Sequence, residues 1–171
     1  GTGNYMFPSF ALQPGFGLLD SFDGGLSWQP SSFEYDFSDN VSTVKLIWDK
    51  IDTNRVYLAA SNGLWVSVDS GATWVNKLSG IACDLVINKV DTSILYVAIE
   101  SQGIYKSTNY GNNWTLLTGS LPPSSETHRI GLAISDGFPN HLVAGITDPI
   151  GFGLKGVFKT DDGGVSWAEI L

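Results

Sequence analysis

The chain has 171 residues, of which 43% are hydrophobic and only 15% charged, a balance that excludes a disordered tail or a coiled coil. Seventeen acidic residues against nine basic ones give a net charge of −8, and the basic residues form no cluster. This argues against nucleic acid and anionic membrane surfaces as partners, and since no apolar run reaches about 18 residues, no membrane insertion is expected.

Four copies of one twelve-residue pattern divide the chain. The pattern reads G-apolar-apolar-x-[ST]-x-[DN]-x-G-x-x-W, and its copies end at Trp28, Trp74, Trp114 and Trp167. Successive tryptophans are 46, 40 and 53 residues apart. Such spacings are typical of a propeller blade, a four-stranded sheet of about 40–50 residues.

Short apolar runs bounded by turn residues precede the second, third and fourth patterns. In chain order they cover 44–48 and 56–60, then 85–87 and 95–99, then 130–134 and 141–146. These runs have the length of strands, and no helical periodicity is sustained. The sequence predicts one all-β domain over 1–171, built from β-propeller blades of four antiparallel strands. The blades fall at approximately 4–38, 39–80, 81–120 and 121–171.

The repeated pattern has the composition of a tight hairpin. Its glycine allows positive φ, its Asp or Asn can accept hydrogen bonds from turn amides, and its Ser or Thr hydroxyl can add another. The tryptophan opens the last strand and is expected to pack between neighbouring sheets. A structural role, separate from ligand binding, is therefore predicted for Asp23, Trp28, Asp69, Trp74, Asn109, Trp114, Asp162 and Trp167.

At its centre the pattern resembles the Asp-box, or BNR repeat. This element occurs in sialidases, sortilin-type receptors, xyloglucan-cleaving glycoside hydrolases and a photosystem II assembly factor, and Asn109 replaces the usual Asp in the third copy. The resemblance implies a hairpin between the third and fourth strands of each blade, away from the ligand face. It therefore indicates architecture and leaves activity open.

The number of strands predicts an incomplete ring. The first repeat begins at the second strand of its blade, 6–12, so the first strand of that blade is missing. The resemblance implies a ring of six to eight blades. An open edge of this kind invites pairing with another strand. We expect a part of a larger propeller, or completion by a partner chain or a second copy, in preference to a self-sufficient ring of about four blades.

The predicted ligand-binding rim is the end of the sheets where fourth-to-first strand connections meet second-to-third strand loops. Two of those connections are long, 29–43 and 119–129. Aromatic rings beside carboxylates suit a polysaccharide or a protein partner, although the rings of 33 and 37 can also fold under the loop. The candidate binding residues are Glu34, Tyr35, Asp36, Phe37, Asp39, Glu100, Glu126, His128 and Phe152.

Catalytic candidates are few. A sialidase needs three arginines and this chain has only Arg55 and Arg129. Xyloglucan-cleaving relatives use two aspartates as general acid and base, and Asp148 resembles one of them, although an ordinary Asp-Pro turn explains it better. His128, His141 and Cys83 lack metal-ligand spacing, so no metal or cofactor is expected.

Two functions remain open from the sequence. The favoured one is a non-catalytic extracellular binding module that presents its rim to a polysaccharide or a protein. The alternative is a part of a secreted glycoside hydrolase whose active site other blades complete. An extracellular or periplasmic location is implied by the resemblance alone.

Overall fold

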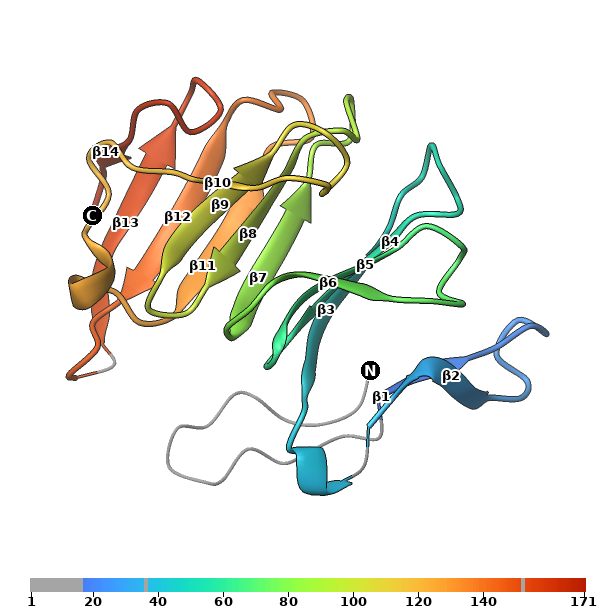
Figure 1. Cartoon of the computed structure of the whole chain (residues 1–171). Coiled ribbons are helices and arrows are strands. Elements are labelled where there is room, and N and C mark those ends of the chain that lie inside the picture. The colour runs from blue at the N-terminus through green and yellow to red at the C-terminus, as the bar shows by residue number, and fades with distance from the viewer. Residues whose placement is uncertain (1–16, 36, 152) are drawn as a thin grey trace.

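A computed structural model of the chain describes residues 17–35, 37–151 and 153–171 (Figure 1). These residues form fourteen β-strands and two three-residue 3-10 helices, η1 (Phe37–Asp39) and η2 (Ser124–Glu126), with no α-helix among them. The predicted all-β class is confirmed. None of the helices in this part of the chain is long and apolar enough to cross a membrane.

The strands form four antiparallel sheets in chain order, the first with two described strands and the others with four. The first holds β1 (Gly17–Asp20) and β2 (Gln29–Glu34). The second holds β3 (Thr43–Trp48), β4 (Val56–Ala60), β5 (Gly63–Ser67) and β6 (Val75–Leu78). The third holds β7 (Ala82–Ile87), β8 (Leu95–Ile99), β9 (Gly103–Ser107) and β10 (Thr115–Leu116). The fourth holds β11 (Ile130–Ile134), β12 (Leu142–Thr147), β13 (Leu154–Thr160) and β14 (Ala168–Glu169).

The sheets follow one another as blades of a propeller, from the first sheet in blue to the fourth in orange and red (Figure 1). The first strands of neighbouring four-stranded sheets contact each other, β3 with β7 and β7 with β11. All five residues of β4 and of β8 are buried, because a neighbouring sheet covers each face of those strands. Apolar runs without alternation, such as 56–60 and 95–99, therefore mark central strands buried on both faces.

Three apolar clusters fill the spaces between successive sheets. Leu18 and Phe33 meet Leu58 between the first and second sheets. Residues of β4 and β5 meet residues of β7 and β8 between the second and third. Tyr96, Leu142 and Trp167 belong to the cluster between the third and fourth. Burial between sheets thus supplies the hydrophobic stabilisation of the fold.

The four hairpins share one set of hydrogen bonds. In each, the Asp or Asn side chain accepts from the backbone amide four residues later, at 2.8–2.9 Å. The preceding Ser or Thr hydroxyl accepts from the hairpin glycine amide, at 2.7–3.0 Å. These glycines have φ between 75° and 94°, where a side chain would be strained. Asn109 keeps the amide bond, whereas the bond from a Ser or Thr hydroxyl to the second carboxylate oxygen is specific to the three aspartate hairpins.

Two sequence expectations need correction. Segment 29–34, assigned to a loop, is strand β2, because it pairs with β1 through Leu19↔Pro30 and Asp20↔Gln29. The indole of Trp28, expected between sheets, is 61% exposed. No described sheet lies on that side of the first hairpin to cover the ring. The predicted strand 6–12 lies outside the described residues.

Candidate functional site

The candidate site is the rim where fourth-to-first strand connections meet second-to-third strand turns. Hydrogen bonds join the two loop types at this end: Ser61 N donates to Ser42 O, Glu100 N to Ile81 O, and Ser101 N to His128 O. The hairpins lie at the other end, where Ser70 N donates to Asn54 O and Gly163 N to Asn140 O. The repeated hairpins are therefore remote from the rim.

The aromatic residues near the first connection are engaged in packing. Phe33 is buried and contacts Tyr35 edge-to-face, with ring centroids 5.0 Å apart. Trp65 and Trp74 contact the same Phe33 ring, at 5.4 and 5.5 Å. The Tyr35 hydroxyl accepts a hydrogen bond from Asn62 Nδ2 at 3.0 Å. These contacts place Phe33 and Tyr35 in a structural aromatic cluster.

The acidic residues predicted on this connection are described in part. Glu34 ends β2 and Asp39 ends η1, and both side chains are exposed. Asp36 and Phe152 lie outside the described residues, as does the side chain of Phe37. The described part of this acidic connection therefore contributes two exposed carboxylates.

Glu100 and His128 meet at the rim between the third and fourth sheets. Glu100 follows β8, His128 precedes β11, and Glu100 Oε1 lies 3.2 Å from His128 Nε2. The two side chains are 17% and 27% exposed. Cys83 Sγ lies 3.9 Å from Glu100 Oε2 and donates weakly to it. The pair is an ion pair whenever the imidazole is protonated, and it joins two sheets.

Asp148 closes its own turn between β12 and β13. Its Oδ1 accepts hydrogen bonds from the amides of Ile150, at 2.7 Å, and Gly151, at 3.0 Å. These two bonds, with the Lys155 ammonium nearby, lower the pKa of the Asp148 carboxyl. A carboxyl that stays ionised suits a base or a charge stabiliser and not a general acid.

Glu126 is tied to the same blade through Lys155. Lys155 Nζ donates to Glu126 Oε2 at 2.9 Å, and this bond is the main reason why the pKa of Lys155 is raised. Lys155 also lies near Asp148, so one lysine faces two rim carboxylates. The sequence analysis missed Lys155, although its place two residues into β13, beside the turn of Asp148, was a usable signal.

A second missed residue, Asp84, links three sheets at their first strands. Asp84 Oδ1 lies 2.7 Å from Lys45 Nζ of β3, and Oδ2 accepts from the amide of Leu132 in β11 at 2.8 Å. Lys45 and Asp84 each precede a leucine in the first strand of their blades. An alignment of the repeats at that leucine places the two opposite charges at the same position of neighbouring strands. Asp84 therefore joins β3, β7 and β11 around one carboxylate.

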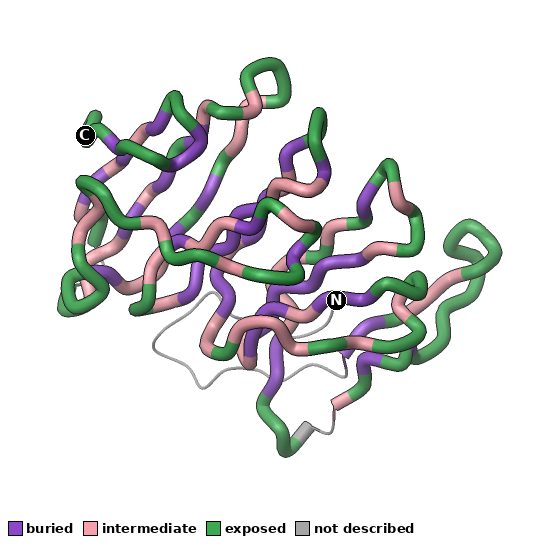
Figure 2. The backbone as a smooth tube through the Cα atoms, turned by 45° about the horizontal axis from the view of Figure 1, so that its top comes forward, coloured by how far each residue is buried: buried purple, intermediate pink, exposed green. Residues whose placement is uncertain are grey.

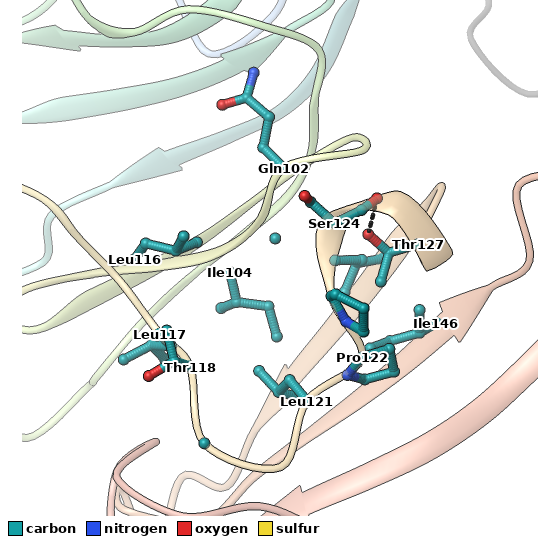
Figure 3. A pocket seen from close by; sticks show the side chains of 14 residues that line it. Gln102, Ile104, Leu116, Leu117, Thr118, Leu121, Pro122, Ser124, Thr127 and Ile146 are labelled. Carbon is teal, nitrogen blue, oxygen red and sulfur yellow. Dashed lines mark hydrogen bonds between the residues drawn. The ribbon is translucent and has the colours of Figure 1, made fainter.

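A pocket of about 220 Å³ opens beside η2, under the connection between β10 and β11 (Figure 3). Its walls are mainly aliphatic or proline side chains: Ile104, Leu116, Leu117, Leu121, Pro122, Pro123, Ile130 and Ile146. Gln102, Thr118, Ser124 and Thr127 supply its polar groups. No aromatic ring or charged side chain is among the residues that line it, so it lacks both a stacking surface for sugar and a group for acid–base chemistry.

The described residues contain no group of three or more His, Cys, Asp or Glu side chains placed to hold a metal ion. The rim carries several carboxylates. These are Glu34, Asp39, Glu100, Glu126 and Asp148.

Two proteins with similar sequences are both named xyloglucanase. No family model matches the sequence. A xyloglucanase from Paenibacillus sp is 29% identical over 142 residues, covering 61% of this chain and 14% of that protein. A xyloglucanase from Hypocrea jecorina (strain QM6a) is 30% identical over 123 residues, covering 69% and 14%. The chain is thus similar to xyloglucanases. It spans about one seventh of the length of these relatives.

Solved structures agree on the fold. An ancestral GH74 enzyme superposes with a TM-score of 0.73 at 16% identity, covering 91% of this chain and 21% of that one. YCF48 from Cyanidioschyzon merolae superposes with a TM-score of 0.52 at 20% identity, covering 77% and 37%. At such identities the similarity establishes a shared propeller fold, and fold alone does not determine activity.

Proposed function

We propose that this chain forms part of a glycoside hydrolase propeller of the xyloglucanase kind, with its rim carboxylates facing the polysaccharide. The observation that carries the proposal is the sequence similarity to two xyloglucanases from different organisms. The rim supports it, because carboxylates from the β2–β3 and β10–β11 connections and from two turns lie at one end of the sheets. Carboxylates of this kind accept hydrogen bonds from sugar hydroxyls.

In this proposal Asp148 is the anionic member of a catalytic pair. Glycoside hydrolysis needs one carboxyl group that donates a proton and a second that acts as base or nucleophile. The bonds from Ile150 and Gly151 suit Asp148 to the second task only. The acid must then be another carboxyl with a raised pKa on the opposite side of the sugar chain. An extracellular or periplasmic location follows from the proposal, because a polysaccharide does not cross a membrane.

Binding is the first test. Electrophoresis of the folded chain in native gels cast with and without xyloglucan measures retardation by the polysaccharide. We expect retardation that weakens when Glu34 and Asp39 are changed together to Gln and Asn. Asp91→Asn, an exposed aspartate on the turn between β7 and β8 at the other end, serves as the matched control. Equal mobility in both gels contradicts the proposal.

The release of new reducing ends from xyloglucan is the second test, because it separates catalysis from binding. Release that disappears in Asp148→Asn, with retardation intact, assigns the chemistry to Asp148. Retardation without release is the outcome both for a non-catalytic binding module and for a chain whose acid lies in other blades, and release by the complete propeller separates the two. One observation favours the non-catalytic binding module: the Asp148 carboxylate already serves two amides of its own turn.

A further inference from the structure

The third hairpin departs from the other three at two positions of the repeated pattern. In the first, second and fourth hairpins the aspartate accepts a hydrogen bond from the hydroxyl of the Ser or Thr four residues later, at 2.6 Å in each. In the third hairpin Asn109 stands at the aspartate position and Asn113 at the Ser or Thr position. Both partners of the hydroxyl–carboxylate bond are therefore replaced in the same hairpin.

The carboxamide of Asn113 takes no part in closing this turn. The backbone amide of Asn113 donates to Asn109 Oδ1 at 2.9 Å, and the Gly111 amide donates to the Ser107 hydroxyl at 2.9 Å. Asn113 is exposed, and its side chain has no hydrogen bond to another residue of the described part of the chain. Its Nδ2 atom is therefore accessible from solvent, and a substituent on that atom would break no bond of the hairpin.

Asn113 also begins a sequence of the form N-x-[ST], the acceptor pattern for N-linked sugar, because Trp114 and Thr115 follow it. The middle residue points into the molecule: the Trp114 indole packs against the cluster between the second and third sheets and donates to Gly111 O at 3.0 Å. Asn113 and Thr115, on either side of it, are both exposed. The carboxamide and the hydroxyl of the pattern thus lie on the outside of a hairpin that the residue between them anchors.

The second sequence of this form, Asn40-Val41-Ser42, has different surroundings. Ser42 is 0% exposed, and its backbone amide donates to Ser61 Oγ at 2.9 Å. Val41 belongs to the apolar cluster between the first and second sheets. In the folded chain the hydroxyl of this pattern is therefore buried, and an exposed carboxamide with an exposed hydroxyl two residues later occurs at Asn113.

The third hairpin lies at the end of the sheets away from the rim. Tyr110 N donates to Ser93 O at 3.0 Å, which joins the hairpin to the turn between β7 and β8 at that end. Exposed residues gather on the loops that connect the strands, and buried residues lie along the strands between them (Figure 2). A large hydrated group on Asn113 would therefore extend into solvent and leave the rim carboxylates accessible.

We propose that Asn113 is an acceptor site for an N-linked oligosaccharide. The inference rests on the proposed function, because that function places the chain on a secretory route, where a lipid-linked oligosaccharide diphosphate is the sugar donor. In the transfer, Asn113 Nδ2 forms a bond to C1 of the first sugar, and the bond between C1 and the diphosphate oxygen breaks. Nδ2 loses one proton to a base of the transferase. The products are the glycosylated amide and the lipid diphosphate.

Secretion of the chain from eukaryotic cells, followed by mass spectrometry of the intact protein, tests the proposal. The chain carries Asn40→Asp, which removes the second acceptor pattern with a residue that tolerates the φ of 58° at that position. We expect most of the secreted chain to gain the mass of one oligosaccharide, and an enzyme that releases N-linked sugar should remove it and leave aspartate at position 113. Secreted chain that is unmodified at this position overturns the proposal.

Three variants in the same background separate the acceptor chemistry from folding. Thr115→Ala removes the hydroxyl of the pattern, and Asn113→Ser removes the carboxamide with the residue type of the other hairpins, so each should abolish the mass increase. Thr115→Ser keeps a hydroxyl and should retain it. A mass increase that survives in Asn113→Ser overturns the assignment to this site. The mass is measured without xyloglucan, so a failure of this proposal and a failure of the proposed function give different results.

Discussion

The first and fourth hairpins have the same local structure and opposite surroundings. Asp23 and Asp162 each accept a bond from an amide four residues later, at 2.9 Å in both hairpins. Yet Trp28 is 61% exposed, whereas Trp167 is 4% exposed. The turn forms from bonds within a few residues, but the indole is buried only where another sheet receives it. Identical motifs therefore contribute differently to stability.

Replacing the two tryptophans should give the largest difference. Trp167→Ala is expected to lower the free energy of unfolding by about 3–5 kcal/mol, because it empties a buried aromatic site. Trp28→Ala should change the free energy of unfolding by less than about 0.5 kcal/mol, because its indole is exposed. Urea unfolding followed by circular dichroism measures both. Equal losses in the free energy of unfolding for the two variants would contradict the exposure of the Trp28 indole.

Trp167→Phe sharpens this comparison. Trp167 Nε1 is buried and has no hydrogen-bond partner among the described residues, so phenylalanine removes an unsatisfied donor while filling most of the space. The loss should be clearly smaller than for alanine. A loss as large as that of Trp167→Ala would indicate that the indole N–H is bonded, for instance to water.

Asp84 should be the next most sensitive position. Asp84→Ala removes the acceptor of the Leu132 amide and the partner of Lys45, so we expect a loss of about 1–3 kcal/mol in the same assay. Asp136→Ala breaks the exposed pair with Lys89 and should cost about 0–1 kcal/mol. Similar effects for the two variants would contradict the role of Asp84 in joining three sheets.

The two tyrosines that bind hairpin carbonyls should differ more modestly. Tyr96→Phe removes a 3.1 Å bond to Gly163 O and should cost about 0.5–1.5 kcal/mol. Tyr57→Phe removes a 3.4 Å bond and should cost less. Burial raises the pKa of both phenols to about 12, so neither ionises between pH 5 and 9. A larger loss for Tyr57→Phe would contradict the order of these distances.

The smallest effect at neutral pH is expected from Asn109→Asp. Bonds from Ser27 lower the pKa of Asp23 from 3.8 to about 2, and equivalent bonds lower those of Asp69 and Asp162. A carboxyl with a lowered folded-state pKa stabilises the fold above its unfolded value and loses that contribution as the pH falls through the folded value. Asn113 offers the amide bond but no hydroxyl, so a fourth aspartate should steepen the fall in melting temperature between about pH 4 and 2 only slightly. Superimposable pH profiles would contradict this.

Much of the fold followed from local sequence patterns. The strands at 56–60 and 95–99 were predictable because apolar runs between turn residues have few other structures available. Strand β2 was not, because Gln29-Pro30-Ser31-Ser32 has the composition of a loop and becomes a strand only by pairing with β1. The Asp-box assignment, the blade boundaries and the extracellular location stay predictions.

The candidate site was less predictable than the fold. Glu100 and His128 were both expected on the rim, but their 3.2 Å contact joins residues of two sheets. Tyr35 was expected as a binding residue, and that role stays a prediction; the structure adds that its ring packs on Phe33. The favoured function also shifted, since the comparisons support the glycoside hydrolase alternative better than the non-catalytic module.

By itself the sequence determined the hairpins, their four repeats and the β-propeller class. Those features depend on hydrogen bonds and apolar runs within about ten residues, which a linear pattern records. Only the tertiary structure decided which tryptophan is buried, which carboxylates have a cationic partner, and that Asp84 joins β3, β7 and β11. The physical reason is that burial and ion pairing depend on groups brought together from distant parts of the chain.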